Sequence, residues 1–135
     1  MDRTADRTAI IELVCAFENA FDEGDFDAHM SVWAKEMAFE SPFATVSTHA
    51  EYRQWVEGFY AQVQEAEPTR HLLTNAVVSL DGDAARMVAY LTVFGQTSGK
   101  MLGTGRFDDE LIRTKAGWRF ARRRFSPDEN VSVGQ

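Results

Sequence analysis

Hydrophobic residues at spacings of three and four predict a helix over residues 4–23. They form one helical face, which consists of Ile10, Leu13, Val14, Phe17 and Phe21. Gly24 can end this helix, because glycine readily adopts the left-handed backbone conformation of a helix terminus. Asp25 can then cap a shorter helix, whose apolar side consists of Phe26, Met30 and Trp33.

A brief strand and a longer helix are predicted next. Met37 and Phe39 alternate with other residues, and Pro42 cannot continue a central strand, so the strand is expected to be short. Thr48 and Glu51 have the spacing of a capping box, which marks the start of a helix. The helix that begins there has an apolar stripe of Tyr52, Trp55, Val56, Phe59 and Val63.

Four strands are predicted in the rest of the chain. They cover residues 70–80, 84–96, 100–114 and 118–125. Asp81-Gly82 is a strong hairpin signal between the first two. In the first strand, alternate residues share one face, which places together His71, Leu73, Asn75 and Val77.

Glycines and charges mark particular positions of this sheet. Four glycines between residues 95 and 105 allow the long strands to bend, so we expect a concave sheet. The acidic residues 108–110 lie on the strand beside Arg122–Arg124, which favours cross-strand ion pairs. We expect these three arginines to be solvated, with side chains that alternate between the two faces.

The composition excludes two classes of partner. A chain of 135 residues with 44% hydrophobic residues is long enough for one domain with one core, which we place over residues 1–135. Its 14 basic and 21 acidic residues give a net charge of -7, which repels nucleic acid and anionic membranes. We therefore expect neither nucleic acid nor a membrane as a partner.

Location and cofactors are inferred from motifs that the sequence lacks. Cys15 is the single cysteine, which fits a reducing compartment, and no apolar run has the length of a signal peptide or a membrane span. We therefore expect a cytoplasmic protein. No metal-ligand, phosphate-loop or dinucleotide motif occurs, so we expect no metal and no cofactor.

Four local motifs occur in a fixed order along the chain. They are Phe21-Asp22-Glu23-Gly24-Asp25, Arg70-His71 with Asn75, Asp81-Gly82-Asp83-Ala84, and Gly105-Arg106-Phe107-Asp108-Asp109 followed by Gly117-Trp118-Arg119-Phe120. With the order of the predicted elements, they resemble the SnoaL-like branch of the nuclear transport factor 2-like superfamily over about residues 6–126. The resemblance implies an α+β, cystatin-like cone, in which three N-terminal helices cover a curved antiparallel sheet. Related proteins include scytalone dehydratase, bile-acid dehydratase and ketosteroid isomerase.

The resemblance also implies a catalytic pair. Asp22 occupies the place where the related dehydratases have an aspartate that pairs with a strand histidine, here His71. A carboxylate bonded to one ring nitrogen fixes the tautomer and raises the basicity of the other nitrogen, which suits removal of a proton next to a carbonyl group. The alternative is that His71 is a core residue and Asp22 a solvated charge at a helix end.

Three positions depart from the enzyme patterns. Phe17 stands where the dehydratases have a tyrosine. Ser41 precedes Pro42 where ketosteroid isomerase has its general-base aspartate, which disfavours steroid-type isomerisation. Phe94 and Gln96 stand where the dehydratases have a second acid or base, and neither titrates near neutral pH.

A largely apolar cavity is expected inside the cone. Its predicted lining is Phe17, Phe21, Trp33, Phe39, Trp55, Phe59, Leu73, Asn75, Tyr90 and Phe107. Such a lining suits a flat, hydrophobic ligand. The alternative for each aromatic residue is simple core packing. His29 and His49 are expected to face water.

The leading hypothesis is a cofactor-free lyase or isomerase that moves protons on a small cyclic hydrophobic compound. One alternative is a non-catalytic module that binds a small ligand. Another is an assembly subunit like the small subunit of ring-hydroxylating dioxygenases. The resemblance also leads us to expect a homodimer, since these cones commonly pack sheet to sheet.

Overall fold

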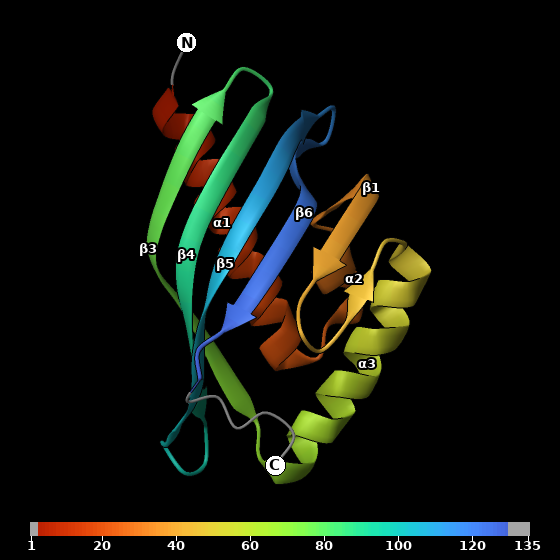
Figure 1. Ribbon diagram of the computed structural model, residues 1–135, viewed down its shortest axis with the longest axis vertical. Helices are drawn as coiled ribbons and strands as arrows, with labels where there is room; N and C mark the ends of the chain where they lie inside the picture. Colours follow the sequence, from red (N-terminus) through yellow and green to blue (C-terminus); the bar gives the residue numbers. More distant parts are fainter. Residues whose placement is uncertain (1–2, 130–135) are drawn as a thin grey trace.

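The computed structural model describes residues 3–129, which fold into a curved six-stranded sheet with α1 across one face (Figure 1). The helices are α1 (Arg3–Glu23), α2 (Phe26–Met30) and α3 (His49–Ala66). The strands are β1 (Trp33–Glu40), β2 (Thr45–Val46), β3 (Thr69–Asp81), β4 (Ala84–Gly95), β5 (Met101–Thr114) and β6 (Gly117–Pro127). Their order in the sheet is β2-β1-β6-β5-β4-β3. This arrangement confirms the predicted α+β architecture.

The helices begin and end where local sequence signals favour it. Gly24 follows α1 with a φ of 71°, and the Asp25 side chain caps α2 by accepting a hydrogen bond from Ala28 N at 3.1 Å. Thr48 caps α3, since its hydroxyl accepts from Glu51 N at 3.2 Å and donates to the Glu51 carboxylate at 2.8 Å. None of the helices described is long and apolar enough to cross a membrane.

The first strand is longer than the sequence predicts. β1 begins at Trp33, a residue that the helical pattern assigned to the second helix. That helix ends at Met30, and the chain then pairs in parallel with β6, with Trp33 opposite Phe120. The Phe120 N–H donates to the Val32 carbonyl at 2.9 Å. A partner strand from the far end of the chain therefore overrides the helical spacing of Trp33.

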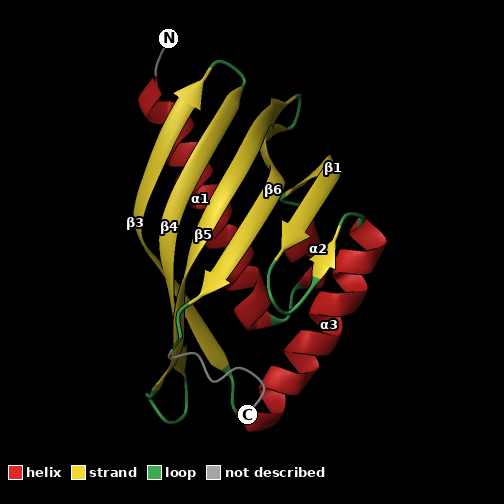
Figure 2. Cartoon of the chain, viewed as in Figure 1, coloured by secondary structure: helices red, strands yellow, loops and turns green. Residues whose placement is uncertain are grey.

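The remaining strands form an antiparallel meander, as predicted, and α1 lies across its concave inner face (Figure 2). The apolar face of α1 packs into the main core. Buried members of this core include Ile10, Val14, Phe17, Phe21, Met87, Ala89, Leu111 and Phe120. The antiparallel pairs β3–β4, β4–β5 and β5–β6 all contain a register shift, which bends the sheet. The curvature inferred from the glycines is therefore present.

A bulge in β3 corrects the predicted faces of two residues. The pairing with β4 shifts between Thr74 and Val77, and Asn75 has a φ of 57°. The extra residue turns the following positions over, so Val78 is buried and Val77 is 60% exposed. Asn75 is exposed as well, so the strict alternation that placed it inside with His71 was wrong.

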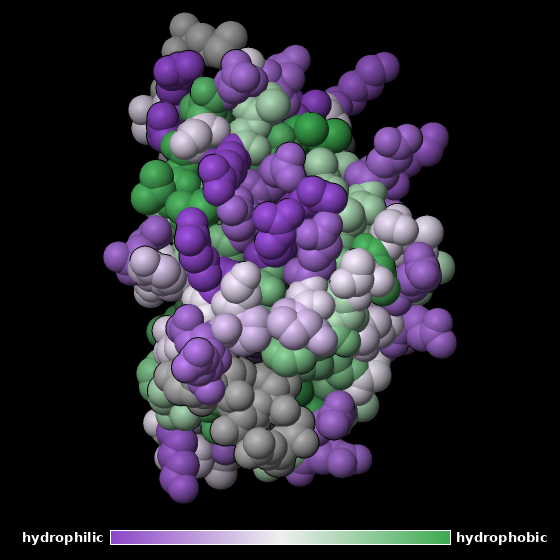
Figure 3. Space-filling model, viewed as in Figure 1, coloured by the Kyte–Doolittle hydropathy of each residue, from purple (hydrophilic) through white to green (hydrophobic). Residues whose placement is uncertain are grey.

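The outer face of the sheet carries charged side chains in cross-strand pairs. Figure 3 shows hydrophilic side chains gathered over the middle of this face. Arg86 on β4 makes a bidentate pair with Asp108 on β5, at 2.6 and 2.9 Å. Arg122 and Arg124 on β6 reach Glu40 on β1 at 2.9 and 3.1 Å. The predicted pairing of residues 108–110 with Arg122–Arg124 appears on this face only as a 3.9 Å approach of Arg122 to Glu110, while Asp108 pairs with Arg86 instead.

Tyr90 also lies on the outer face, which corrects its predicted place in the cavity lining. It is 55% exposed, and its β4 neighbours Ala89 and Leu91 are buried on the opposite side. Strand alternation therefore points Tyr90 away from α1. The sequence did not show which of the two faces of β4 the helices cover.

Candidate active site

Asp22 and His71 are in direct contact. Asp22 lies in the last turn of α1, and His71 lies near the start of β3, which packs along that helix. The Asp22 Oδ1 atom is 2.6 Å from His71 Nδ1, and Oδ2 accepts the His71 backbone N–H at 2.7 Å. The Thr69 hydroxyl also donates to Asp22, at 3.1 Å. Three hydrogen bonds thus fix the carboxylate and orient the imidazole.

This geometry leaves the second ring nitrogen of His71 available. Because a carboxylate only accepts, Nδ1 carries the hydrogen, and Nε2 of the neutral ring carries a lone pair. No other described residue forms a hydrogen bond with Nε2. The side chains of His71 and Asp22 are 14% and 12% exposed. The pair is therefore shielded but reachable.

The surroundings of His71 favour its protonated form. Burial opposes the charge, but the hydrogen bond to Asp22 and the negative charges of Glu18 and Asp22 outweigh burial and raise the pKa of His71. A raised pKa means a stronger base. The pair can accept a proton through Nε2 and stabilise the imidazolium that results.

A second charged group lies on the same inner face; the sequence predicted a cross-strand pair between Arg123 and Asp109, but not its burial. Arg123 is fully buried, and its guanidinium makes two hydrogen bonds with the equally buried Asp109, at 2.7 and 3.1 Å. The guanidinium lies over the Phe107 ring at 3.7 Å and the Phe120 ring at 4.4 Å. The expectation that all three arginines of 122–124 are solvated was therefore wrong for the middle one, because α1 covers the face to which Arg123 points.

Glu18 on α1 completes this buried group. It is 4% exposed, and its Oε1 atom lies 3.5 Å from Arg123 Nη1. Burial raises the pKa of Glu18, although His71 and Arg123 act against it. Burial also raises the pKa of Asp109, to about 6, against the opposing effect of Arg123. One signal could have revealed Glu18: it falls four residues after Val14, on the apolar face of α1.

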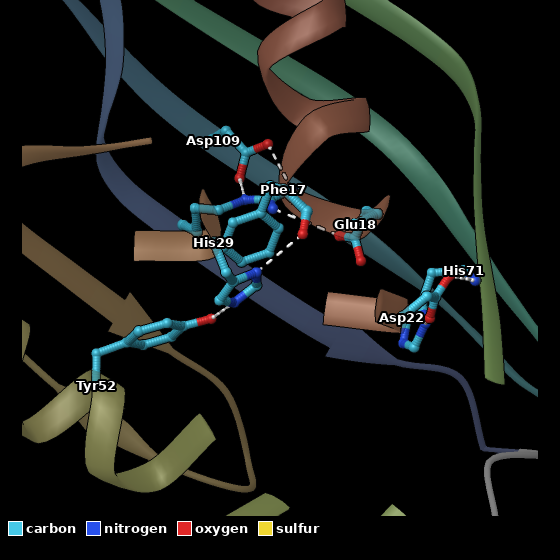
Figure 4. A network of polar contacts seen from close by, with 8 residues as sticks. Phe17, Glu18, Asp22, His29, Tyr52, His71 and Asp109 are labelled. Carbon is cyan, nitrogen blue, oxygen red and sulfur yellow. Dashed lines mark hydrogen bonds and ion pairs between the residues drawn. The ribbon is translucent and has the colours of Figure 1, made fainter. Parts of the chain in front are cut away.

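His29 is buried rather than solvated, which corrects the expectation for it. Its Nδ1 atom lies 2.8 Å from the Phe17 carbonyl, so Nδ1 carries the hydrogen, and the Tyr52 hydroxyl donates to Nε2 at 2.8 Å (Figure 4). Burial lowers the pKa of His29 to about 4, so its ring is neutral near pH 7. Both nitrogens are occupied, and Phe17 stacks on the ring at 3.8 Å. His49 is half-buried, and its Nε2 bonds to the Ala34 carbonyl at 2.7 Å.

The predicted aromatic lining is divided between the core and the neighbourhood of His71. Phe21 meets the His71 ring edge to face at 4.9 Å, and Phe59 lies 6.1 Å from Phe21. Other predicted members are buried or half-buried in the packed core, namely Phe17, Trp33, Phe39, Trp55, Leu73 and Phe107. Asn75 and Tyr90 lie outside it.

A shallow depression lies on the outer face of the sheet. Its lining mixes apolar residues of the strands with charged ones, which include Arg86, Asp108, Glu110 and Arg124. The depression is open to solvent, so it does not enclose a hydrophobic compound, and it lies across the sheet from His71. We therefore place the candidate site at the Asp22–His71 pair. Within residues 3–129, no group of three or more histidine, cysteine or acidic residues is arranged to hold a metal ion.

Comparison with known families decides the family of the chain. The model of the SnoaL-like domain matches residues 2–124. The chain belongs to the SnoaL-like domain family. This SnoaL-like protein shows no match to a curated protein.

Several solved structures share the fold. A Nostoc punctiforme protein of unknown function with a cystatin-like fold is 25% identical, with 96% of each chain covered and a TM-score of 0.85. A proposed aromatic ring hydroxylase from Novosphingobium aromaticivorans is 29% identical, with 94% of this chain and 92% of that chain covered and a TM-score of 0.73. A proposed dehydratase of the NTF2-like family from Streptomyces avermitilis is 19% identical, with 93% and 98% covered and a TM-score of 0.79. These likenesses confirm the nuclear transport factor 2-like, cystatin-like fold.

Proposed function

We propose that this SnoaL-like protein is a cofactor-free lyase or isomerase in which His71, oriented by Asp22, moves protons on a small cyclic hydrophobic compound. The observation that carries the proposal is the 2.6 Å contact between Asp22 Oδ1 and His71 Nδ1, together with the Nε2 atom that this contact leaves free. A base held in one tautomer next to a fixed carboxylate is suited to proton transfer.

The proposed step begins at a carbon next to a carbonyl group. His71 Nε2 takes a proton from that carbon, and the electron pair of the C–H bond moves onto the carbonyl oxygen to give an enolate. The enolate then returns its electrons and expels a hydroxyl group from the next carbon, which leaves as water with the proton from the imidazolium. In an isomerisation, the same proton returns to a different carbon. Both outcomes restore neutral His71.

The neighbours of His71 support a hydrophobic substrate. The ring of Phe21 packs against the imidazole, and Phe59 and Tyr60 contact Phe21 at 6.1 and 5.5 Å. Aromatic side chains favour flat apolar ligands and lower the local dielectric constant, which strengthens the Asp22–His71 interaction. The Streptomyces avermitilis relative, described as a proposed dehydratase, agrees with this chemistry.

Deuterium exchange tests the proposal even when the product is not known. The protein is incubated in D2O with a panel of cyclic ketones and cyclic β-hydroxy ketones, and mass spectrometry follows deuterium uptake and loss of water. His71→Gln should reduce the rate by roughly 10²- to 10⁴-fold. His49→Gln is the matched control, since His49 bonds to a backbone carbonyl away from Asp22. Equal rates in wild type and His71→Gln would refute the proposal.

A non-catalytic binding module is the second candidate, and two observations favour it. Phe17 provides no hydroxyl group where the dehydratases have one. Tyr52 does not replace it, since its hydrogen is donated to His29. Mass spectrometry of the denatured protein after mild purification distinguishes this candidate: a bound apolar compound without deuterium exchange would support it.

We also infer that two copies pair through their outer sheet faces. Apolar residues are exposed on this face beside the charged pairs, including Val77 at 60% and Tyr90 at 55%. Arg86 and Asp108 carry opposite charges on this face. When the same face of a second copy packs against it, positive residues can therefore lie opposite negative ones. Sedimentation should show a dimer that Tyr90→Glu weakens. A monomer at all concentrations would contradict the inference.

A further inference from the structure

The inner face of the sheet holds one buried cation and two buried carboxylates. The side chains of Arg123 and Asp109 are fully buried, and the Glu18 side chain is 5% exposed. If all three were ionised, the group would carry one positive and two negative charges in a region with little water. An uncompensated buried charge is costly, and such a group usually takes up a proton instead.

The two carboxylates do not share Arg123 equally. Both Asp109 oxygens accept from the guanidinium, through Nε at 2.7 Å and Nη2 at 3.1 Å. Glu18 approaches Nη1 at 3.5 Å, and among residues 3–129 neither Glu18 Oε1 nor Arg123 Nη1 finds a hydrogen-bond partner. Glu18 is therefore the carboxyl group that gains most from protonation, because its charge is the less well compensated of the two.

Glu18 also faces the Asp22–His71 pair. Residues 18 and 22 are one turn apart on α1, so their side chains leave the helix on the same side. Figure 4 shows Glu18 between Asp109 and that pair. The charge of Glu18 favours the protonated form of His71, and the charge of Asp22 favours the protonated form of Glu18.

The other charged or titratable neighbours of Glu18 are few. Burial raises the pKa values of Cys15 on α1 and Tyr52 on α3, and the charge of Glu18 adds to both increases. Burial keeps His29 on α2 neutral, although its hydrogen bond to the Phe17 carbonyl acts against this by raising the pKa of His29. The protonation of Glu18 is therefore coupled near neutral pH to that of His71. It is also coupled to that of Asp109, which shares Arg123 with Glu18.

We propose that Glu18 is a positioning residue of the site, a buried carboxyl group that shares one proton with His71. The inference rests on the proposed function. Glu18 would be the second titrating group of the site, which Phe94 and Gln96 do not provide. When the proton is on Glu18, His71 is a neutral base with Nε2 free. When the proton is on His71, ionised Glu18 stabilises the imidazolium. The distribution of this proton between Glu18 and His71 sets the fraction of molecules with a neutral His71. Only these molecules can accept a proton from a substrate through Nε2.

Nuclear magnetic resonance tests the proposal directly on the unaltered protein. With glutamate labelled at its carboxyl carbon, the Glu18 signal should titrate well above the ordinary range of glutamate, and in the same pH interval as the His71 ring nitrogens. A Glu18 signal that titrates in the ordinary range would overturn the proposal. This measurement needs neither a substrate nor a substitution.

Glu18→Gln then isolates the effect on His71. It keeps the size of the side chain and removes its charge, so the midpoint of the His71 titration should move to lower pH and become a single step. Glu23→Gln is the matched control, since Glu23 lies exposed on the same helix beside Asp22. A His71 midpoint that is the same in Glu18→Gln, Glu23→Gln and wild type would overturn the proposal.

The two proposals fail in different ways. If no compound exchanges deuterium but the His71 midpoint moves in Glu18→Gln, the coupled pair stands and the lyase or isomerase proposal fails. If exchange occurs and its pH profile is the same in wild type and Glu18→Gln, the proposed function stands and the role of Glu18 fails. When both hold, the rise in exchange rate with pH should begin at lower pH in Glu18→Gln than in Glu23→Gln.

Discussion

The carboxylate of Asp22 binds His71 through two separate atoms, the ring nitrogen Nδ1 at 2.6 Å and the backbone nitrogen at 2.7 Å. The backbone contact fixes the start of β3 against the end of α1. The ring contact fixes the tautomer. The same carboxylate thus holds the backbone of this region and orients the imidazole. A change at Asp22 should therefore affect the stability of the region and the pKa of His71.

Asp22→Asn should weaken the base and slow any reaction that depends on it. An amide in place of the carboxylate removes the negative charge next to the imidazole, so the pKa of His71 should fall. Nitrogen chemical shifts of the labelled ring report this directly, and deuterium exchange should slow by about 10²-fold or more. Asp27→Asn is the control, because Asp27 is exposed and pairs with Arg53, away from His71. An unchanged His71 titration in Asp22→Asn would contradict the prediction.

Protonation of His71 should stabilise the fold. Its pKa is raised in the folded protein, whereas the unfolded chain has the ordinary value of about 6.5. The stabilisation is therefore complete below that value and is lost as the pH rises through the folded value. Urea unfolding across this interval should show a fall in the free energy of unfolding that is absent in His71→Gln. An equal fall in both proteins would assign it to another group.

His29 should have the opposite effect on stability. Burial lowers the pKa of His29 to about 4 in the folded protein. Between pH 6.5 and 4, His29 therefore stays neutral in the folded protein but is protonated in the unfolded chain, where its pKa is about 6.5. Stability should decline as the pH falls from 6.5 to 4, by about 3 kcal/mol from this group. The decline should be smaller in His29→Gln and unchanged in His49→Gln. The same decline in His29→Gln as in wild type would show that other groups cause it.

Arg123→Met should destabilise the protein far more than Arg124→Met. The first change leaves Asp109 buried without its cation, which costs about 3–5 kcal/mol. The second removes an exposed pair with Glu40, worth about 1 kcal/mol or less. Urea unfolding measures both. The double variant Arg123→Met with Asp109→Leu should recover part of the loss, and equal costs for the two single variants would refute the burial of Arg123.

The bulge in β3 can be tested at Asn75. A β-branched residue is strained at a φ of 57°, so Asn75→Val should reduce the free energy of unfolding by about 1–2 kcal/mol. Asn75→Gly should cause little change, because glycine adopts this conformation without strain. Thr74→Val, one position earlier on the exposed face, is the control. Equal stability of Asn75→Val and Asn75→Gly would mean that β3 has no bulge at this position.

The sequence by itself determined most of the elements and the candidate pair of Asp22 and His71. Spacings of three and four located α1 and α3, Asp81-Gly82 located a hairpin, and local motifs pointed to Asp22 and His71. These features depend on residues close together in the chain, or on a family pattern that preserves their order, so they can be recognised before the chain folds.

Only the tertiary structure decided which faces are covered. Alternation along β6 shows that Arg123 opposes its two neighbours, but not that α1 lies on its side and brings Glu18 to it. One extra residue at Asn75 reverses the second half of β3, and no local signal predicted it. The burial of His29 likewise depends on Tyr52 from a distant helix. Burial and long-range pairing arise when separate elements pack together, so local periodicity does not contain them.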